Sequence, residues 1–87
     1  MDDRTEKLAK ERVESELKLK GIGNIDNFCF YHDGFSFTVA TELEAYKSAY
    51  VYRHCDDVIV RPTVLPTKDW SVHIYTKGGR KWARQAP

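Results

Sequence analysis

Two cysteines and three histidines are the side chains best suited to bind a metal or to act as nucleophiles: Cys29, His32, His54, Cys55 and His73. Thiolate and imidazole are the usual zinc donors. On an extended strand, however, Cys29 and His32 are an odd number of positions apart and so face opposite sides of a sheet. Because no CxxC or HxxxH spacing occurs, we expect neither a metal site nor a cofactor.

The spacing gives catalysis no better support. His54 and Cys55 are adjacent, and neighbours on a helix project about 100° apart, so they do not form a catalytic dyad. The acidic residues fall at helix positions where solvation and pairing with lysine explain them. No glycine stretch has the GxxxxGK or GxGxxG pattern of a phosphate-binding loop. We therefore expect no enzymatic activity.

Aromatic and basic residues near the C-terminus are more informative. Residues 70–76 alternate in polarity, and Gly78-Gly79 is typical of a two-residue hairpin turn. A returning strand over 80–85 then pairs Tyr75 with Trp82, Ile74 with Ala83 and His73 with Arg84. The candidate binding residues carry a ring or a positive charge: His73, Tyr75, Lys77, Arg80, Lys81, Trp82 and Arg84.

Rings and cations on one sheet face are typical both of surfaces that stack bases and of protein-interface hot spots. Alternatively, Tyr75 and Trp82 form a cross-strand pair that closes the core, and the cations serve solubility. Charge is also unevenly distributed: residues 61–87 carry a net +5, whereas residues 1–60 carry −4. Such asymmetry fits an acidic partner, although the two ends could simply neutralise each other.

Residues 3–20 predict a helix with a narrow apolar stripe, Ala9, Val13 and Leu17, and Gly21 is expected to end it. Its Glu and Lys residues form i,i+4 pairs, among them Glu16–Lys20. A stripe this thin docks on a sheet edge or on a partner. We therefore expect residues 1–22 to form a charged and mobile helix.

Residues 27–40 predict a hairpin around Asp33-Gly34, a typical type I′ turn dipeptide. The predicted pairs are His32–Phe35, Phe30–Phe37 and Phe28–Val39. Alternation places Phe28, Phe30, Phe37 and Val39 on one face, and Cys29, Tyr31, Ser36 and Thr38 on the other.

Thr41-Glu42-Leu43-Glu44 matches a capping box and predicts a helix to about His54. Its Leu43, Tyr46 and Tyr50 are expected to pack on the phenylalanines of the hairpin. Tyr31 and Tyr52 fit either the surface or a second core.

A short strand follows at 58–61, and Pro62 and Pro66 favour an edge position or an irregular crossover. The predicted order is α-β-β-α-β-β-β, an α+β fold with two helices and an antiparallel sheet of about five strands. Eighty-seven residues indicate a single domain, 1–87, with its α+β core over 27–85.

Without a signal peptide or an apolar run long enough to span a membrane, and with only two cysteines, we expect a cytoplasmic protein.

The stretch from Thr41 to Gln85 resembles small phage-encoded anti-CRISPR proteins of the type I-F inhibitors. The similarity lies in the capped helix, the strands after it and the ending Gly79-Arg80-Lys81-Trp82. The resemblance implies an inhibitor, in the cytoplasm of a bacterial host, that docks on a CRISPR surveillance complex and blocks DNA access. It implicates Arg80 and Lys81, and secondarily Lys47 and Arg53. The long N-terminal helix and Pro62 and Pro66 depart from the family.

The sequence thus favours a non-catalytic binding protein whose partner is a protein or a ribonucleoprotein complex, with the basic and aromatic side chains as the contact surface. The alternatives are direct nucleic-acid binding by that same face, and a homodimeric adaptor that pairs through a strand edge or through the N-terminal helix.

Overall fold

The computed structural model describes residues 3–63 and 68–76. Its elements in chain order are α1 (Asp3–Lys18), β1 (Asp26–Tyr31), β2 (Gly34–Val39), α2 (Glu42–Val51), β3 (Asp57–Pro62) and β4 (Trp70–Tyr75). The strands form one sheet in the order β1-β2-β4-β3, with every neighbouring pair antiparallel. The predicted α+β class and its two helices are confirmed. The described strands number four rather than about five.

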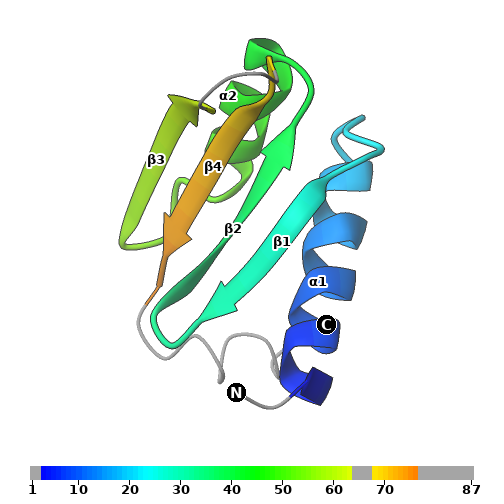
Figure 1. Ribbon diagram of the computed structural model, residues 1–87, viewed down its shortest axis with the longest axis vertical. Coiled ribbons are helices and arrows are strands. Elements are labelled where there is room, and N and C mark those ends of the chain that lie inside the picture. The colour runs from blue at the N-terminus through cyan, green and yellow to red at the C-terminus, as the bar shows by residue number, and fades with distance from the viewer. Residues whose placement is uncertain (1–2, 64–67, 77–87) are drawn as a thin grey trace.

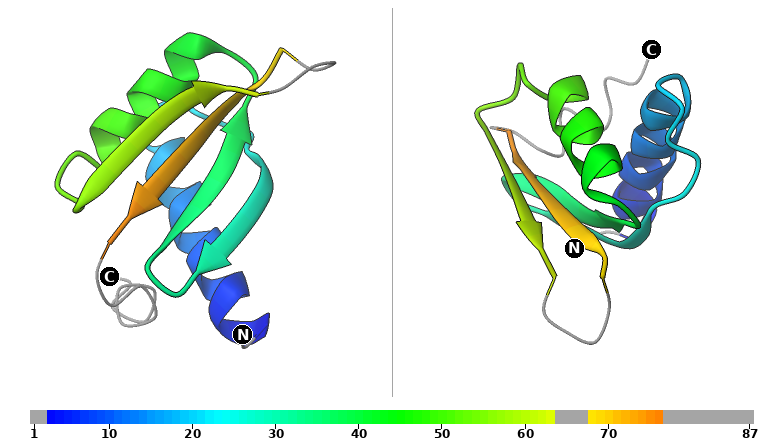
Figure 2. Two further views of the ribbon diagram at one scale, coloured as in Figure 1. Left: turned by 60° about the vertical axis from the view of Figure 1, so that its left-hand side comes forward. Right: turned by 90° about the horizontal axis from the view of Figure 1, so that it is seen from above.

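The molecule has two layers, with both helices on one face of the sheet (Figures 1 and 2). Strands β2 and β3 are both antiparallel to β4 and therefore parallel to each other, and α2 connects them. The helix must then cross the sheet to bring β3 to the far side of β4. This crossover fixes α2 over β2, β3 and β4, whereas α1 contacts β1.

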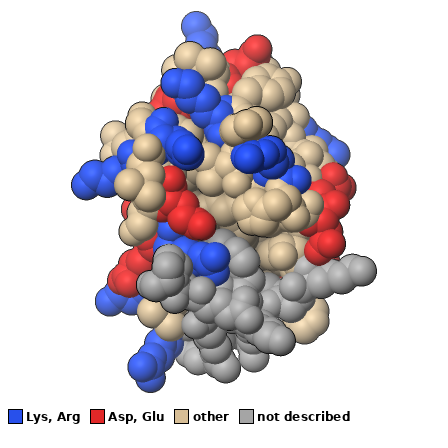
Figure 3. Space-filling view, turned by 180° about the vertical axis from the view of Figure 1, so that it is seen from behind, with Lys and Arg blue, Asp and Glu red and all other residues tan. Residues whose placement is uncertain are grey.

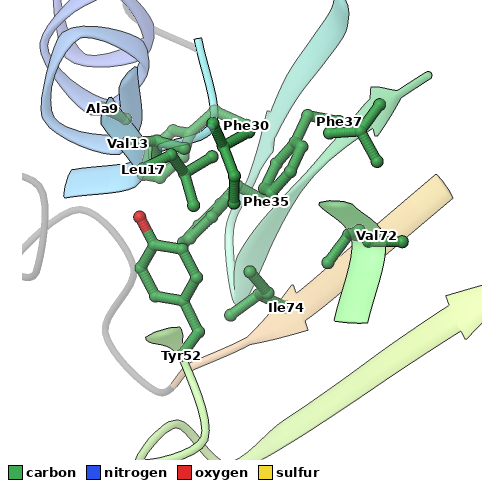
Figure 4. Close-up of a cluster of buried hydrophobic side chains, with 12 residues drawn as sticks. Ala9, Val13, Leu17, Phe30, Phe35, Phe37, Tyr52, Val72 and Ile74 are labelled. Atoms are coloured by element: carbon green, nitrogen blue, oxygen red, sulfur yellow. The ribbon is translucent and has the colours of Figure 1, made fainter. Parts of the chain in front are cut away.

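The predicted apolar stripe of α1 packs into the core. Ala9, Val13 and Leu17 are fully buried, while Leu8 and Leu19 remain exposed. The N-terminal helix therefore shares one core with the rest of the domain. Figure 4 shows this core, which lies between α1 and the sheet. The buried side chains are Ala9, Val13, Leu17, Ile22, Phe30, Phe35, Phe37, Val39, Ala45, Tyr52, Val72 and Ile74.

The end of α1 is a Schellman motif. Gly21 has φ 82°, the left-handed conformation expected of a helix-stopping glycine. Its N–H donates to the Lys18 carbonyl at 3.0 Å, and the Ile22 N–H donates to the Leu17 carbonyl at 3.0 Å. Ile22 and Leu17 are both buried, so the turn also adds an apolar contact to the core.

The first hairpin forms, but its predicted register is wrong. Phe30 pairs with Phe35 rather than with Phe37. The turn residues are His32-Asp33, and neither has the positive φ that a type I′ turn requires. Because the shift is two positions, each side chain keeps its predicted face.

Gly34 is needed for the approach of β4 rather than for the turn. A Cβ atom there would overlap the carbonyl oxygen of Ile74 and lie 3.0 Å from the Tyr75 Cα. The close contact between β2 and β4 therefore requires glycine at this position. The Asp33-Gly34 pattern thus predicted the hairpin at the right place, but through the turn type. In the structure the glycine is required by the contact with β4.

The strand β4 lies in the interior of the sheet. His73, Ile74 and Tyr75 each pair with β2 on one side and with β3 on the other. Their predicted pairing with a strand over 80–85 is therefore wrong, because β4 has no unpaired edge over these residues. Residues 80–85 themselves lie outside the described part of the chain.

Candidate binding surface on helix α2

Helix α2 begins where the capping box predicts. The Glu44 N–H donates to Thr41 Oγ1 at 3.2 Å, and the Thr41 hydroxyl donates to Glu44 Oε1 at 2.9 Å. The Glu44 side chain thus accepts from the capping hydroxyl instead of from the backbone N–H of a typical capping box. The helix ends at Val51, three residues before the predicted end at His54.

The orientation of α2 is the opposite of the predicted one. Leu43, Tyr46 and Tyr50 share a face as expected, but they are 65%, 55% and 64% exposed. Ala45 and Ser48 face the sheet and are fully buried. Small residues allow the helix to approach a sheet already filled with phenylalanine rings, and close packing therefore selects the small face.

A tyrosine just beyond α2 fills the remaining core space. Tyr52 is fully buried, with its ring edge-on to Phe35 at a centroid distance of 5.2 Å. Its hydroxyl donates to Glu16 Oε1 of α1 at 2.8 Å. Glu16 also lies 3.7 Å from the Arg12 guanidinium, in place of the predicted pairing with Lys20. Burial, and then the Glu16 carboxylate, raise the pKa of Tyr52 far above its ordinary value.

The outward face of α2 borders an open groove of about 410 Å³. We call it the α2 groove, and its lining residues are Lys20, Leu43, Tyr46, Lys47, Tyr50 and Val51. Its volume falls in the range of ligand sites in proteins. Most of its exposed lining surface is apolar, which favours a partner that buries apolar groups there.

Basic side chains lie at this apolar surface. Lys20 and Lys47 line the groove. Arg53 lies with its guanidinium carbon 4.0 Å from the centroid of the Tyr50 ring, a cation–π contact, and donates to the Tyr50 carbonyl at 2.8 Å. Figure 3, which faces the helices, shows Lys and Arg side chains bordering uncharged surface in the upper half of this face.

Of the site residues predicted from the sequence, Lys47 thus lines the α2 groove, and Arg53 stacks on Tyr50, one of its lining residues. Leu43, Tyr46 and Tyr50, which also line the groove, were expected in the core instead. One signal could have identified them: in Leu43, Tyr46 and Tyr50 the large residues fall on one face of α2, whereas Ala45 and Ser48 supply an alternative packing face.

The predicted primary site is described only in part. His73 and Tyr75 project from β4 on the face opposite the buried Val72 and Ile74, as expected. Tyr31 lies on the same face, and its hydroxyl is 2.9 Å from Ser36 Oγ. The other predicted residues lie outside the described part of the chain: Lys77, Arg80, Lys81, Trp82 and Arg84.

The cysteines lie apart. Cys29 is exposed on β1, whereas Cys55 is half-buried after α2, and both are free thiols. Burial and the nearby Asp56 carboxylate raise the pKa of Cys55. Within residues 3–63 and 68–76, no three His, Cys, Asp or Glu side chains come together as a metal-ligand set.

Comparison of the chain with protein-family models gives no match, and comparisons with curated proteins and with solved structures give none either. The resemblance to anti-CRISPR proteins therefore stays a prediction. In the described part of the chain, neither helix is long and apolar enough to cross a membrane.

Proposed function

We propose that this protein is a non-catalytic binding protein that holds an acidic segment of a partner protein in the α2 groove. The observation that carries the proposal is the exposure of Leu43, Tyr46 and Tyr50, each more than half exposed, along one groove. A protein that exposes its large apolar side chains together leaves a surface that association can cover.

The chemistry of the surface supports a protein partner. Tyrosine and arginine are enriched among the residues that dominate interface energies, and the stacked Arg53 and Tyr50 pair is of that kind. The apolar lining favours leucine-like or aromatic anchors on the partner. Lys20 and Lys47 favour carboxylates beside those anchors, because charge complementarity raises both the association rate and the specificity.

The anti-CRISPR resemblance is a narrower form of the same proposal. In that case the partner is a CRISPR surveillance complex, and the bound inhibitor blocks DNA access by steric occlusion. The resemblance implicates Lys47, which lines the α2 groove, and Arg53, which stacks on Tyr50 of the groove lining.

Selection from a displayed library of random linear peptides tests the proposal. Enriched peptides are expected to combine acidic residues with two or more apolar anchors. Their affinity should fall by about tenfold or more in Tyr46→Ser/Tyr50→Ser. Lys20→Glu/Lys47→Glu should weaken binding chiefly at low salt, because exposed charges are screened.

Leu8→Ser is the matched control, because Leu8 is also an exposed apolar residue, 42% exposed, but lies on α1 away from the groove lining. It should leave the affinity unchanged. The absence of enriched peptides, or equal binding to wild type and to Tyr46→Ser/Tyr50→Ser, would contradict the proposal.

Direct binding of single-stranded nucleic acid is a second candidate. It is favoured by Tyr31, His73 and Tyr75 on the sheet face opposite the helices, because aromatic rings on such a face stack bases. Titration of a generic single-stranded oligonucleotide at several salt concentrations separates the two functions. A steep log–log salt dependence that Tyr75→Ala weakens supports the sheet face rather than the α2 groove.

A further inference from the structure

The strand β3 forms one edge of the sheet, and Figure 1 shows no described element beyond it. An edge strand presents N–H and C=O groups that can pair with another strand. The opposite edge, β1, has a register irregularity between Asp26 and Cys29, where Asn27 has φ 54°. β3 pairs with β4 from Asp57 to Pro62 without a register shift, so β3 is the more regular template.

The hydrogen bonds at the end of β3 show which residues direct their backbone groups outward. The Thr63 N–H donates to the Asp69 carbonyl at 3.0 Å, so Thr63 faces β4. Since direction alternates along an antiparallel strand, Val58, Val60 and Pro62 face away from the sheet.

Two further details agree with this assignment. Pro62 has no N–H to donate, and edge strands accept proline where the N–H would face solvent. The Val58 N–H is bonded to no strand but to the Asp57 side chain, at 2.9 Å.

The sequence of β3 is complementary to itself. Asp57-Val58-Ile59-Val60-Arg61 has opposite charges at its ends and β-branched residues between them. If two copies pair antiparallel about a two-fold axis at Ile59, each Val58 lies opposite the Val60 of the other copy. Val58 and Val60 both direct their backbone N–H and C=O groups outward, so each such pair exchanges both hydrogen bonds.

The same register brings the charges together. Asp57, Ile59 and Arg61 project on the sheet face opposite the helices, since their neighbours Val58 and Val60 align with the buried Ile74 and Val72. Each Asp57 then lies opposite the Arg61 of the other copy, and the two Ile59 side chains meet at the axis. Opposite charges and β-branched pairs at cross-strand positions are both stabilising.

We propose that β3 pairs with β3 of a second copy of this chain, so that two sheets join into one across a two-fold axis. On pairing, the Val58 N–H donates to the Val60 carbonyl of the second copy instead of to the Asp57 carboxylate of its own chain. The Asp57 carboxylate is then free to pair with Arg61 of the second copy. The contact is one strand wide, so the dimer is weak and depends on concentration. This interface is separate from the α2 groove, and neither proposal depends on the other.

Sedimentation equilibrium from about 10 µM to about 1 mM tests the dimer, a range suited to millimolar and micromolar affinities. The wild type should pass from monomer to dimer. Arg61→Asp places two carboxylates opposite each other at both ends, and Asp57→Arg does the same with two guanidinium groups. Each should weaken the dimer by about tenfold or more, whereas Asp57→Arg/Arg61→Asp should restore it to within about threefold.

A wild type that stays monomeric over the whole range would overturn the proposal. So would a dimer that Arg61→Asp leaves unchanged, or a folded double variant that stays as weak as the single ones. Val60→Pro is an independent check, because it removes an outward N–H that the sheet does not use. An undiminished dimer in that variant would also overturn the proposal, even if the double variant failed to fold.

Discussion

The two helices lie on the same face of the sheet but use their apolar residues in opposite ways. Helix α1 buries its whole apolar stripe, Ala9, Val13 and Leu17. Helix α2 buries Ala45 and Ser48 and leaves its larger apolar residues exposed. The apolar face of a helix therefore does not by itself indicate the core side, because the space left by neighbouring side chains decides which face fits.

The difference has a cause in the sheet. Phe35 and Phe37 of β2 lie nearly parallel, with centroids 6.4 Å apart, and already fill the layer beneath the helices. Tyr52 adds its ring from just beyond α2. Little volume remains under α2, so alanine and serine fit where leucine and tyrosine would overpack the core. The buried Ser48 hydroxyl is satisfied by the Glu44 carbonyl at 2.7 Å.

Truncation of the buried stripe of α1 should have the largest effect on stability. Leu17→Ala removes a fully buried side chain and leaves a cavity, and it should lower the free energy of unfolding by about 2–5 kcal/mol. Leu19→Ala is the matched control, because Leu19 is 85% exposed, and it should change stability by about 0.5 kcal/mol or less. Urea unfolding of both variants measures the difference. Equal losses would contradict the packing of α1.

A smaller effect is expected at the link between the two helices. Tyr52→Phe removes the hydrogen bond to Glu16 and should cost about 0.5–1.5 kcal/mol in urea unfolding. Because burial raises the pKa of Tyr52, its contribution is present below about pH 10, the ordinary tyrosine pKa, and is lost as pH rises further. The alkaline loss of stability should therefore be smaller in Tyr52→Phe. An identical alkaline profile in both proteins would contradict the buried position of this hydroxyl.

The exposed face of α2 should contribute least to stability. Tyr46→Ser/Tyr50→Ser should lower the free energy of unfolding by about 1 kcal/mol or less, because it removes only a tilted ring contact with Trp70 and the Arg53 stack. The thermal midpoint, compared with that of Leu17→Ala, measures the contrast. A loss as large as that of Leu17→Ala would show that these tyrosines support the fold and would remove the reason to assign them to binding.

Local patterns predicted the elements well where one residue decides the conformation. Thr41 caps the start of α2. Gly21 ends α1, because glycine adopts the left-handed backbone conformation without steric strain. The alternating hairpin residues kept their predicted faces even though the register moved, because two positions restore the same side of the strand. The binding surface was only half predicted: Lys47 and Arg53 were identified, but Tyr46 and Tyr50 were assigned to the core.

The sequence by itself determined the periodicity of each segment, the start of α2 at Thr41, the glycine stop after α1 and the division of each strand into two faces, because these depend on neighbours a few residues away. The tertiary structure alone decided that β4 lies between β2 and β3, that α2 turns its small face inward and that Tyr52 reaches α1. Those outcomes depend on volumes and pairings between residues far apart in the chain, which only the assembled core brings into contact.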